Sequence, residues 1–198
     1  MEAGVLPVMD HGSPECELRL TLIHSYDAVN VLNTRVLKPC MPLTHFKAFF
    51  CEQMNLVALH TMYQWYNHTL TSLWWVDSTD SPASDILLGP EAPDPLVMVA
   101  WRCTQLHEIV LLGYKYCDED LMAIARLKRT RLKRLEIAER DVIQELCPLD
   151  GLINDVSDSM GKPWAPLQDS QLHDVILNPI QGDSDEYILP ILMQDQLS

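Results

Sequence analysis

A short hydrophobic pattern of the form L-x-x-L-x-L recurs along the chain, with substitutions at some of its positions. Alternation of apolar and polar residues over such a stretch predicts a β-strand that buries one face. Successive copies are 26, 27, 36 and 26 residues apart, measured between their central residues. The longest interval contains 78–93, which is rich in Ser, Asp and Pro and indicates an inserted loop. The central residues of the five predicted strands are Leu20, Phe46, Leu73, Ile109 and Leu135.

The segments between the predicted strands have the periodicity of helices. Apolar residues from 28 to 36 recur at a spacing of 3.6 residues, after Asp27 and before Pro39. Asp94 is a favourable helix start because a proline follows it, and Asp118 introduces a helix whose first turn is acidic. The pattern over 55–66 is less regular but also favours a helix. Strands and helices are therefore expected to alternate.

This alternation predicts an α/β fold, and the repeat length together with the Leu pattern is typical of a leucine-rich-repeat solenoid. No such unit buries its apolar side alone, so units stack, strands pair in parallel and helices cover the outer face. A compact doubly wound α/β domain has the same alternation and is the alternative. The regular interval between strands favours the solenoid. Neither G-x-G nor G-K-[ST] occurs among the seven glycines, which argues against a nucleotide site.

The last predicted strand needs a cover for its apolar edge. A one-sided helical pattern over 149–160 ends at Gly161, a residue suited to terminating a helix. Pro163 then fixes the direction of the chain just before Trp164. We expect Trp164 to lie over the final repeat as a structural cap residue, not as a contact for a partner.

These patterns divide the chain into three parts. An N-terminal segment, 1–16, is expected to be flexible, and 17–165 forms the repeat domain with a terminal helical cap at 149–165. An acidic tail, 166–198, has prolines and no clear repeat, so we expect it to be flexible. Within this tail, 189–193 is a short apolar patch that is able to dock on the domain.

Charge narrows the range of partners. The chain has 14 Lys and Arg against 28 Asp and Glu, a net charge of −14, which disfavours nucleic acid and anionic membranes as partners. Hydrophobic stretches are all shorter than the roughly 18 residues that a membrane span requires. Five basic residues could suggest a nucleic-acid patch, but most of them are expected to form a solvated turn between helix and strand, partly balanced by acids beyond Asp141: Lys128, Arg129, Arg131, Lys133 and Arg134.

The six cysteines show no spacing typical of a metal site. None lies two to four residues from another, whereas structural zinc sites usually contain such close pairs. The N-terminus has no basic residue ahead of a hydrophobic run, so it does not resemble a secretion signal. We therefore expect reduced thiols and a cytoplasmic and/or nuclear location.

Several strings of the sequence resemble one protein family. The most distinctive is D-P-L-V-M-V-A-W-R-C-T-Q-L at 94–106, followed by L-K-R-L-E at 132–136 and M-G-K-P-W at 160–164; L-K-P-C-M-P-L at 37–43 also fits. Together they resemble the C-terminal leucine-rich-repeat half of F-box proteins, most closely the F-box-only group numbered thirty-three and thirty-nine. The resemblance covers roughly residues 18–165.

The resemblance implies a role in protein recognition. Members of this family are substrate receptors of SCF ubiquitin ligases, in which an F-box helix bundle binds the Skp adaptor and cullin while the repeats hold the protein to be ubiquitinated. No F-box is recognisable before the repeats, so we expect a fragment or short isoform that reaches the adaptor and cullin only if an F-box is supplied elsewhere. The alternative is a leucine-rich-repeat interaction module not coupled to ubiquitination.

In the predicted repeats, the residues beside each buried central residue point to the concave face of the sheet. Trp74 is the candidate that we favour for partner binding, because Trp is enriched at binding hot spots. The alternative is that the loop 78–93 covers Trp74. The candidate partner-binding residues on this face are Lys47, Trp74, Val110, Arg134 and Glu136.

No set of residues predicts catalysis or a cofactor. Cys103 and His107 lie four residues apart, but Cys103 belongs to the apolar stripe of a predicted helix and is better interpreted as core. The acids 118–120 favour the start of a helix without a metal ion. We expect neither enzymatic activity nor a bound metal or cofactor, and the expected partner is a protein.

Overall fold

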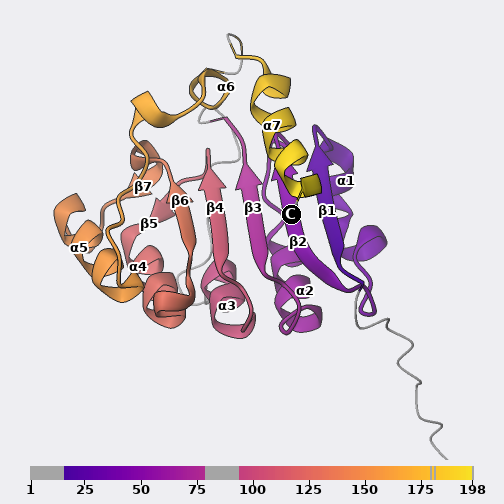
Figure 1. Cartoon of the computed structure of the whole chain (residues 1–198), viewed down its shortest axis with the longest axis horizontal. Helices are drawn as coiled ribbons and strands as arrows, with labels where there is room; N and C mark the ends of the chain where they lie inside the picture. Colours follow the sequence, from indigo (N-terminus) through magenta and orange to yellow (C-terminus); the bar gives the residue numbers. More distant parts are fainter. Residues whose placement is uncertain (1–15, 79–93, 179, 181, 198) are drawn as a thin grey trace, which may run out of the picture.

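The structure, a computed structural model, describes residues 16–78, 94–178, 180 and 182–197. Apart from Cys16 and Ser78, the predicted N-terminal segment and inserted loop lie outside the described residues. The described part is an α/β fold around a five-stranded sheet in the order β1-β2-β3-β4-β6, in which every neighbouring pair is parallel (Figure 1). The strands are β1 (Leu18–Ile23), β2 (Leu43–Phe49), β3 (Ser72–Val76), β4 (Glu108–Leu112) and β6 (Arg134–Ile137).

The register of this sheet confirms the interval read from the sequence. The five central residues form one continuous row: Leu20 is opposite Phe46, Phe46 opposite Leu73, and the row continues through Ile109 to Leu135. The repeated Leu pattern therefore sets which residues are neighbours on adjacent strands. Side chains alternate between the two faces of a strand, so the rows on either side of this one point to the opposite face.

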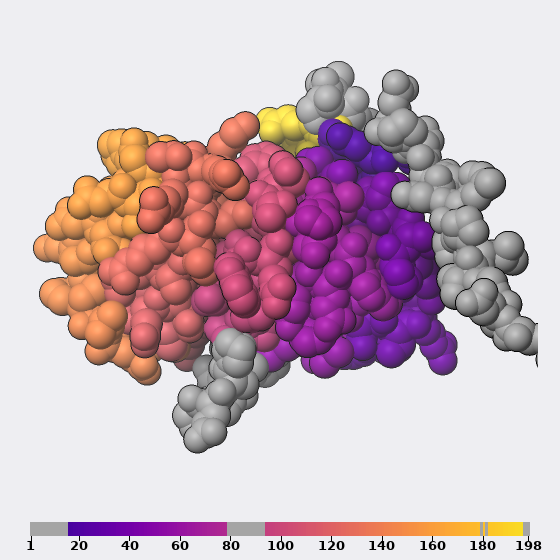
Figure 2. All heavy atoms as spheres, turned by 90° about the horizontal axis from the view of Figure 1, so that it is seen from below, coloured from indigo at the N-terminus to yellow at the C-terminus, as the bar shows by residue number. Residues whose placement is uncertain are grey.

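Helices cover one face of the sheet, and the chain advances along the long axis of the molecule from one strand–helix unit to the next (Figures 1 and 2). The capping interactions predicted from the sequence appear at α3, where Asp94 Oδ1 accepts the amides of Leu96 and Val97 at 2.7 and 3.0 Å. The helices on this face are α1 (Tyr26–Asn30), the π-helix Leu32–Val36, α2 (Leu56–Trp65), α3 (Pro95–Arg102), α4 (Asp118–Lys128) and α5 (Leu149–Met160).

Asp118 has a different role from the cap that the sequence indicates. It is the first residue of α4, with no exposed surface, and its carboxylate accepts the backbone N–H groups of Glu145, Leu146 and Cys147. A helix-start acid thus also fixes the loop after β7 (Val142–Ile143), a short strand that pairs in parallel with β5 (Tyr116–Cys117). Hydrogen bonds from these amides hold the pKa of Asp118 below its ordinary value, against the effect of burial.

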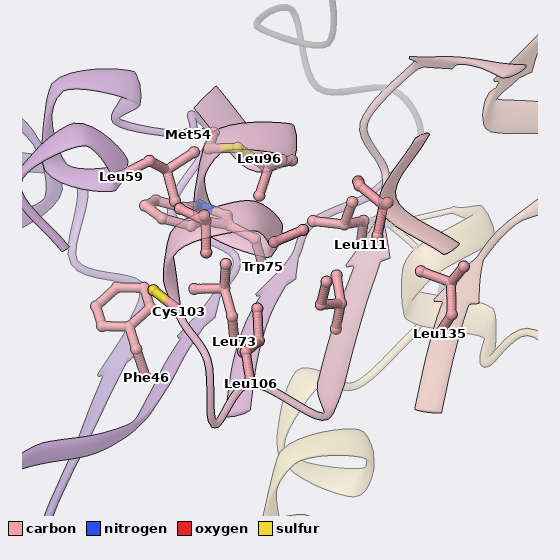
Figure 3. Close-up of a cluster of buried hydrophobic side chains, with 14 of the residues drawn as sticks. Phe46, Met54, Leu59, Leu73, Trp75, Leu96, Cys103, Leu106, Leu111 and Leu135 are labelled. Atoms are coloured by element: carbon pink, nitrogen blue, oxygen red, sulfur yellow. The ribbon is translucent and has the colours of Figure 1, made fainter. Parts of the chain in front are cut away.

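The main hydrophobic core lies between the sheet and the helices (Figure 3). The strands contribute the central row and the row two residues beyond it, which includes Trp75 on β3. Trp75 is fully buried, lies 5.1 Å from Phe46 between ring centroids and donates its indole N–H to the carbonyl of Gln53 at 3.3 Å. Leu59 of α2 and Leu96 of α3 pack into the same core from the helices.

The segment after α5, which the sequence predicts to be a cap, lies against the β6 edge of the sheet. Gly161 ends α5 in the left-handed conformation, with φ of 68°. Trp164 is buried in the main core, and its indole N–H donates to the carbonyl of Leu135 on β6 at 2.8 Å. The chain then runs beside β6, where Leu167 forms a parallel bridge with Ala138. This position suits a capping residue, and its contribution to stability stays a prediction.

The segment expected to be a flexible acidic tail contains two helices on the other face of the sheet. After a 3-10 turn (Asp169–Gln171) come α6 (Asp174–Leu177) and α7 (Ser184–Leu197), and α7 lies in front of β2 and β3 in Figure 1. Tail residues, including Val175, Ile176 and Ile188, are buried in a second apolar cluster with residues from the strands. Across the described chain, helices are too short or too polar to span a membrane.

Candidate functional site

Two rows of residues on the helix-free face define the candidate site, and both have the register that the sequence predicts. One row runs Arg19, His45, Ser72, Glu108 and Arg134, and the other runs Thr21, Lys47, Trp74, Val110 and Glu136. The N-terminal halves of the strands thus bring together charged residues that are far apart in the sequence. We call the resulting cavity, of about 260 Å³, the charged pocket; it is lined by Arg19, His45, Lys47, Trp74, Glu108, Arg134, Ile191, Gln194 and Asp195.

Trp74 forms the floor of the charged pocket between two cations. The Lys47 ammonium lies 4.2 Å from the centre of the indole ring, and the Arg134 guanidinium lies 4.3 Å from it. Lys47 is on β2, next to β3, and Arg134 is on β6, beyond β4, so the ring holds a cation from each direction by cation–π attraction.

Arg134 connects the two rows through a network of ion pairs. Its guanidinium donates to both carboxylate oxygens of Glu136, at 2.7 and 2.9 Å, and also to Glu108 at 3.2 Å. Burial acts to raise the pKa of Glu108, but the interactions of its carboxylate with Ser72, the Trp74 indole and Arg134 outweigh burial and hold the pKa below its ordinary value. Glu108 is therefore an anion at neutral pH, and the Arg134 charge is matched within the pocket.

The C-terminal helix supplies the remaining wall. Asp195 of α7 accepts two hydrogen bonds from the Lys47 ammonium, at 2.8 and 2.6 Å, and its backbone carbonyl accepts one from Arg19 at 2.7 Å. Burial and the nearby Arg19 charge lower the pKa of His45, which favours a neutral imidazole at neutral pH. The pocket is thus a mixed-charge cavity in which the cations come from the sheet and one of the acids comes from α7.

The five predicted binding residues lie together on one face, but their accessibility differs. Arg134 and Glu136 reach solvent, with 39% and 27% of their side chains exposed. Trp74, Val110 and Lys47 are buried, because α6 and α7 pack above this part of the sheet. The alternative drawn from the sequence, that the loop 78–93 covers Trp74, lies outside the described residues apart from Ser78. Among the described residues, side chains of α6 and α7 pack in the same apolar cluster as Trp74.

The predicted binding residues do not include several side chains that line the charged pocket. Arg19, His45 and Glu108 belong to the row before the central residues, so the repeat itself contains the signal that identifies them. Asp195 gives no comparable signal, because no local pattern relates it to Lys47. The apolar patch 189–193 is the one sign in the tail sequence of a segment able to dock.

Cys103, considered for catalysis from the sequence, lies in an environment that serves packing. Cys103 is fully buried in the main core, and burial raises the pKa of its thiol to about 12, so the reactive thiolate is suppressed. Lys128, which is also buried, donates to the carbonyl of Cys103 at 2.6 Å. Within the described ranges, no group of three or more His, Cys, Asp or Glu side chains is arranged to hold a metal ion.

The basic residues from the last turn of α4 to β6 have several different environments. Arg126 pairs with Asp155 at 2.7 Å, and Arg134 belongs to the charged pocket. Arg129, Arg131 and Lys133 are exposed around the 3-10 turn that precedes β6. The prediction of a solvated turn is therefore right for Arg129, Arg131 and Lys133, and Asp155 is an acid beyond Asp141 that balances Arg126. The prediction is wrong for Lys128, which is the last residue of α4 and is buried.

Comparison with known proteins adds a family relationship. No protein-family model matches the sequence. The chain is 31% identical over 169 residues to F-box only protein 33 of Homo sapiens, a match that covers 79% of this chain and 30% of the human protein. It is likewise 31% identical over 157 residues to F-box only protein 33 of Mus musculus, covering 73% and 28% of the two sequences.

These matches support kinship with the F-box only proteins. They agree with the strings from 94–106 and 160–164 that resemble this family in the sequence. The chain spans less than a third of the length of the relatives it matches.

Proposed function

We propose that this chain is the substrate-recognition part of an SCF-type F-box ubiquitin ligase and that it binds a protein through the charged face of its sheet. The observation that carries this proposal is the similarity to F-box only protein 33 over 169 residues. The proposed role is recognition without chemistry by this chain. The Skp adaptor and cullin take part only if an F-box is supplied elsewhere.

The fold supports a repeat architecture for this role. We infer a leucine-rich-repeat solenoid, since the central row from Leu20 to Leu135 repeats one residue position per parallel strand. Stacked units present one residue of each strand to a common face, so such sheets form extended binding surfaces. Here that surface has charges of both signs, which suits a polar protein segment better than an apolar ligand.

Arg134 and Glu136 are the proposed contact residues that solvent reaches directly. Lys47 and Trp74 lie beneath them and hold the floor of the pocket, while Val110 belongs to the apolar part under α6 and α7. Charged groups at a partly exposed rim mainly determine specificity and the rate of association. Replacing Arg134 by an acid would place three carboxylates together and should repel a partner that uses this face.

The test is quantitative affinity purification of the tagged chain from cells treated with a proteasome inhibitor. Arg134→Glu is compared with Arg131→Glu, a matched charge reversal at an exposed position outside the pocket. We expect at least one protein to be recovered with wild type and Arg131→Glu but lost with Arg134→Glu, while both variants keep the wild-type melting temperature within a few degrees. Identical recovery with both variants would contradict binding through this face.

The same purification separates the two candidate roles. Repeating it with purified Skp adaptor and cullin added, and again without them, shows whether they join the complex and whether the captured protein becomes ubiquitinated. If the face-dependent partner is recovered in both conditions, but the added adaptor does not join the complex, the result would favour the alternative of an interaction module not coupled to ubiquitination.

A further inference from the structure

The C-terminal helix occupies the face that the proposed function requires. α7 packs with Tyr187 against Phe49 and Phe50, at ring distances of 6.2 Å, and buries Ile188 in the second apolar cluster. One helical turn further, Ile191 contributes to the wall of the charged pocket. A protein segment that bound this face would therefore have to meet α7 or take its place.

The end of α7 neutralises a buried cation. Only 5% of the Lys47 side chain is exposed, and the Asp195 carboxylate binds its ammonium with both oxygens. A buried charge is strongly unfavourable unless it is paired and hydrogen-bonded. If α7 moved away, the Trp74 ring alone would not replace a carboxylate, so the face then favours an occupant that brings a new one.

Several features of α7 indicate a helix that is held less firmly than those on the other face. Pro190 lies inside it and removes one backbone hydrogen-bond donor from the helix. Its outer side leaves Leu189 and Met193 exposed, at 54% and 65%, so apolar residues lie on both sides of the helix. Ile191 and Leu192 are only partly buried on the second cluster. Local opening is favoured where few buried apolar contacts hold a segment.

We propose that α7 is an internal occupant of the binding face, and that the protein partner replaces it with a helical segment carrying an acidic residue for Lys47. This inference rests on the proposed function and specifies its partner. The pattern to be matched is that of α7 itself: apolar residues seven and four positions before the acid, as Ile188 and Ile191 precede Asp195. Residues at these spacings share one face of a helix.

The probe is a labelled peptide with the sequence of residues 184–197, titrated against the full chain by fluorescence anisotropy. In wild type the attached α7 competes at high effective concentration, so binding of the added peptide is weak. Asp195→Lys in the chain places two cations together, releases α7 and leaves the face open for the peptide, which still carries its Asp. We expect the affinity for the peptide to rise at least about 10-fold, because apparent affinity scales with the open fraction.

Matched variants define the role of charge. Glu186→Lys makes the same charge change at an exposed position of α7 and should leave the peptide affinity at the wild-type value. Combining Lys47→Glu with Asp195→Lys restores an ion pair of opposite polarity inside the chain and should close the face again. A peptide carrying the Asp195→Lys change should not bind the Asp195→Lys chain.

Three results would overturn the inference: equal peptide affinity for the Asp195→Lys and Glu186→Lys chains, binding that does not depend on the peptide acid, or wild-type α7 amides that exchange with solvent only as slowly as those of β2. The last would show that α7 opens only when the whole fold does. These measurements need no cellular partner. If the peptide binds as expected but the purification yields no face-dependent partner, the replacement of α7 by a helical segment would stand, while the proposed function would be contradicted.

Discussion

The two faces of the sheet are stabilised by different interactions. The helix-covered face repeats one apolar row on every strand, from Leu20 to Leu135, and helices close it with residues of similar chemistry. The opposite face has charged residues over the N-terminal halves of the strands and an apolar area over their C-terminal halves, which α6 and α7 cover. One sheet thus combines a core that is fixed by local repetition with a surface that a distant segment of the chain completes.

The largest effect is expected on the helix-covered face. Trp75→Ala removes a fully buried ring from the main core and should lower the free energy of unfolding by about 3–5 kcal/mol. Urea unfolding followed by circular dichroism measures it. Trp101→Ala is the control, because Trp101 is 55% exposed and its loss should cost about 0.5 kcal/mol or less. Similar losses for both variants would contradict the assigned core.

The cap at the end of the sheet should have the next largest effect. Trp164→Ala leaves a cavity beside β6 and removes the hydrogen bond to Leu135, so we expect a loss of about 3 kcal/mol and a tendency to aggregate. Trp164→Phe keeps most of the packing and should lose about 1 kcal/mol. An unchanged urea midpoint together with lost partner binding would show instead that Trp164 contacts a partner.

Asp141, a buried acid at the C-terminal ends of the strands, should make the stability of the fold depend on pH. Asp141 accepts the Gly113 amide at 2.9 Å, and burial raises its pKa from 3.8 to about 6. The folded state thus binds a proton on the Asp141 carboxylate more tightly than the unfolded chain does. The resulting stabilisation is fully present below about pH 4 and is lost as pH rises through about 6.

Asp141→Asn removes this titration while keeping an oxygen that accepts the Gly113 amide. We expect the variant to be more stable than wild type at pH 7 by about 1–2 kcal/mol and to show a flatter decline in unfolding free energy between pH 4 and 6. Urea unfolding at a series of pH values gives both quantities. Asp158→Asn, at an exposed site, is the matched control, and an equal change in that variant would contradict the assignment.

The smallest effect on stability is expected in the charged pocket. Arg134→Met removes ion pairs with Glu108 and Glu136 from a side chain that is 39% exposed, so the loss should be about 1 kcal/mol or less. Arg126→Met, which breaks an exposed pair with Asp155, should leave the urea midpoint unchanged. If Arg134→Met loses a face-dependent partner and Arg126→Met does not, the helix-covered face mainly provides stability and the charged face mainly provides binding. A loss as large as that of Trp75→Ala would show that the pocket is a second core.

Much of the fold could be predicted because its determinants are local. Each strand carries its own alternation, so the spacing of the repeats is enough to place Phe46 and Leu73 opposite each other. Asp94 and Gly161 mark helix ends through their own side chain or backbone conformation. The same reasoning identifies the rows of the candidate site, since a residue beside a central position has to point to the other face.

The sequence by itself thus determined the strand interval, the parallel rows and the side of the sheet that carries the candidate residues. Only the tertiary structure decided what covers that side. The Lys47–Asp195 ion pair joins residues 148 positions apart, and no periodic pattern links two such positions. α7 also has apolar residues on both sides, with Ile188 buried and Leu189 exposed, so its own sequence does not reveal which side packs on the sheet. Its placement follows from complementarity with a face that exists only once the strands have assembled.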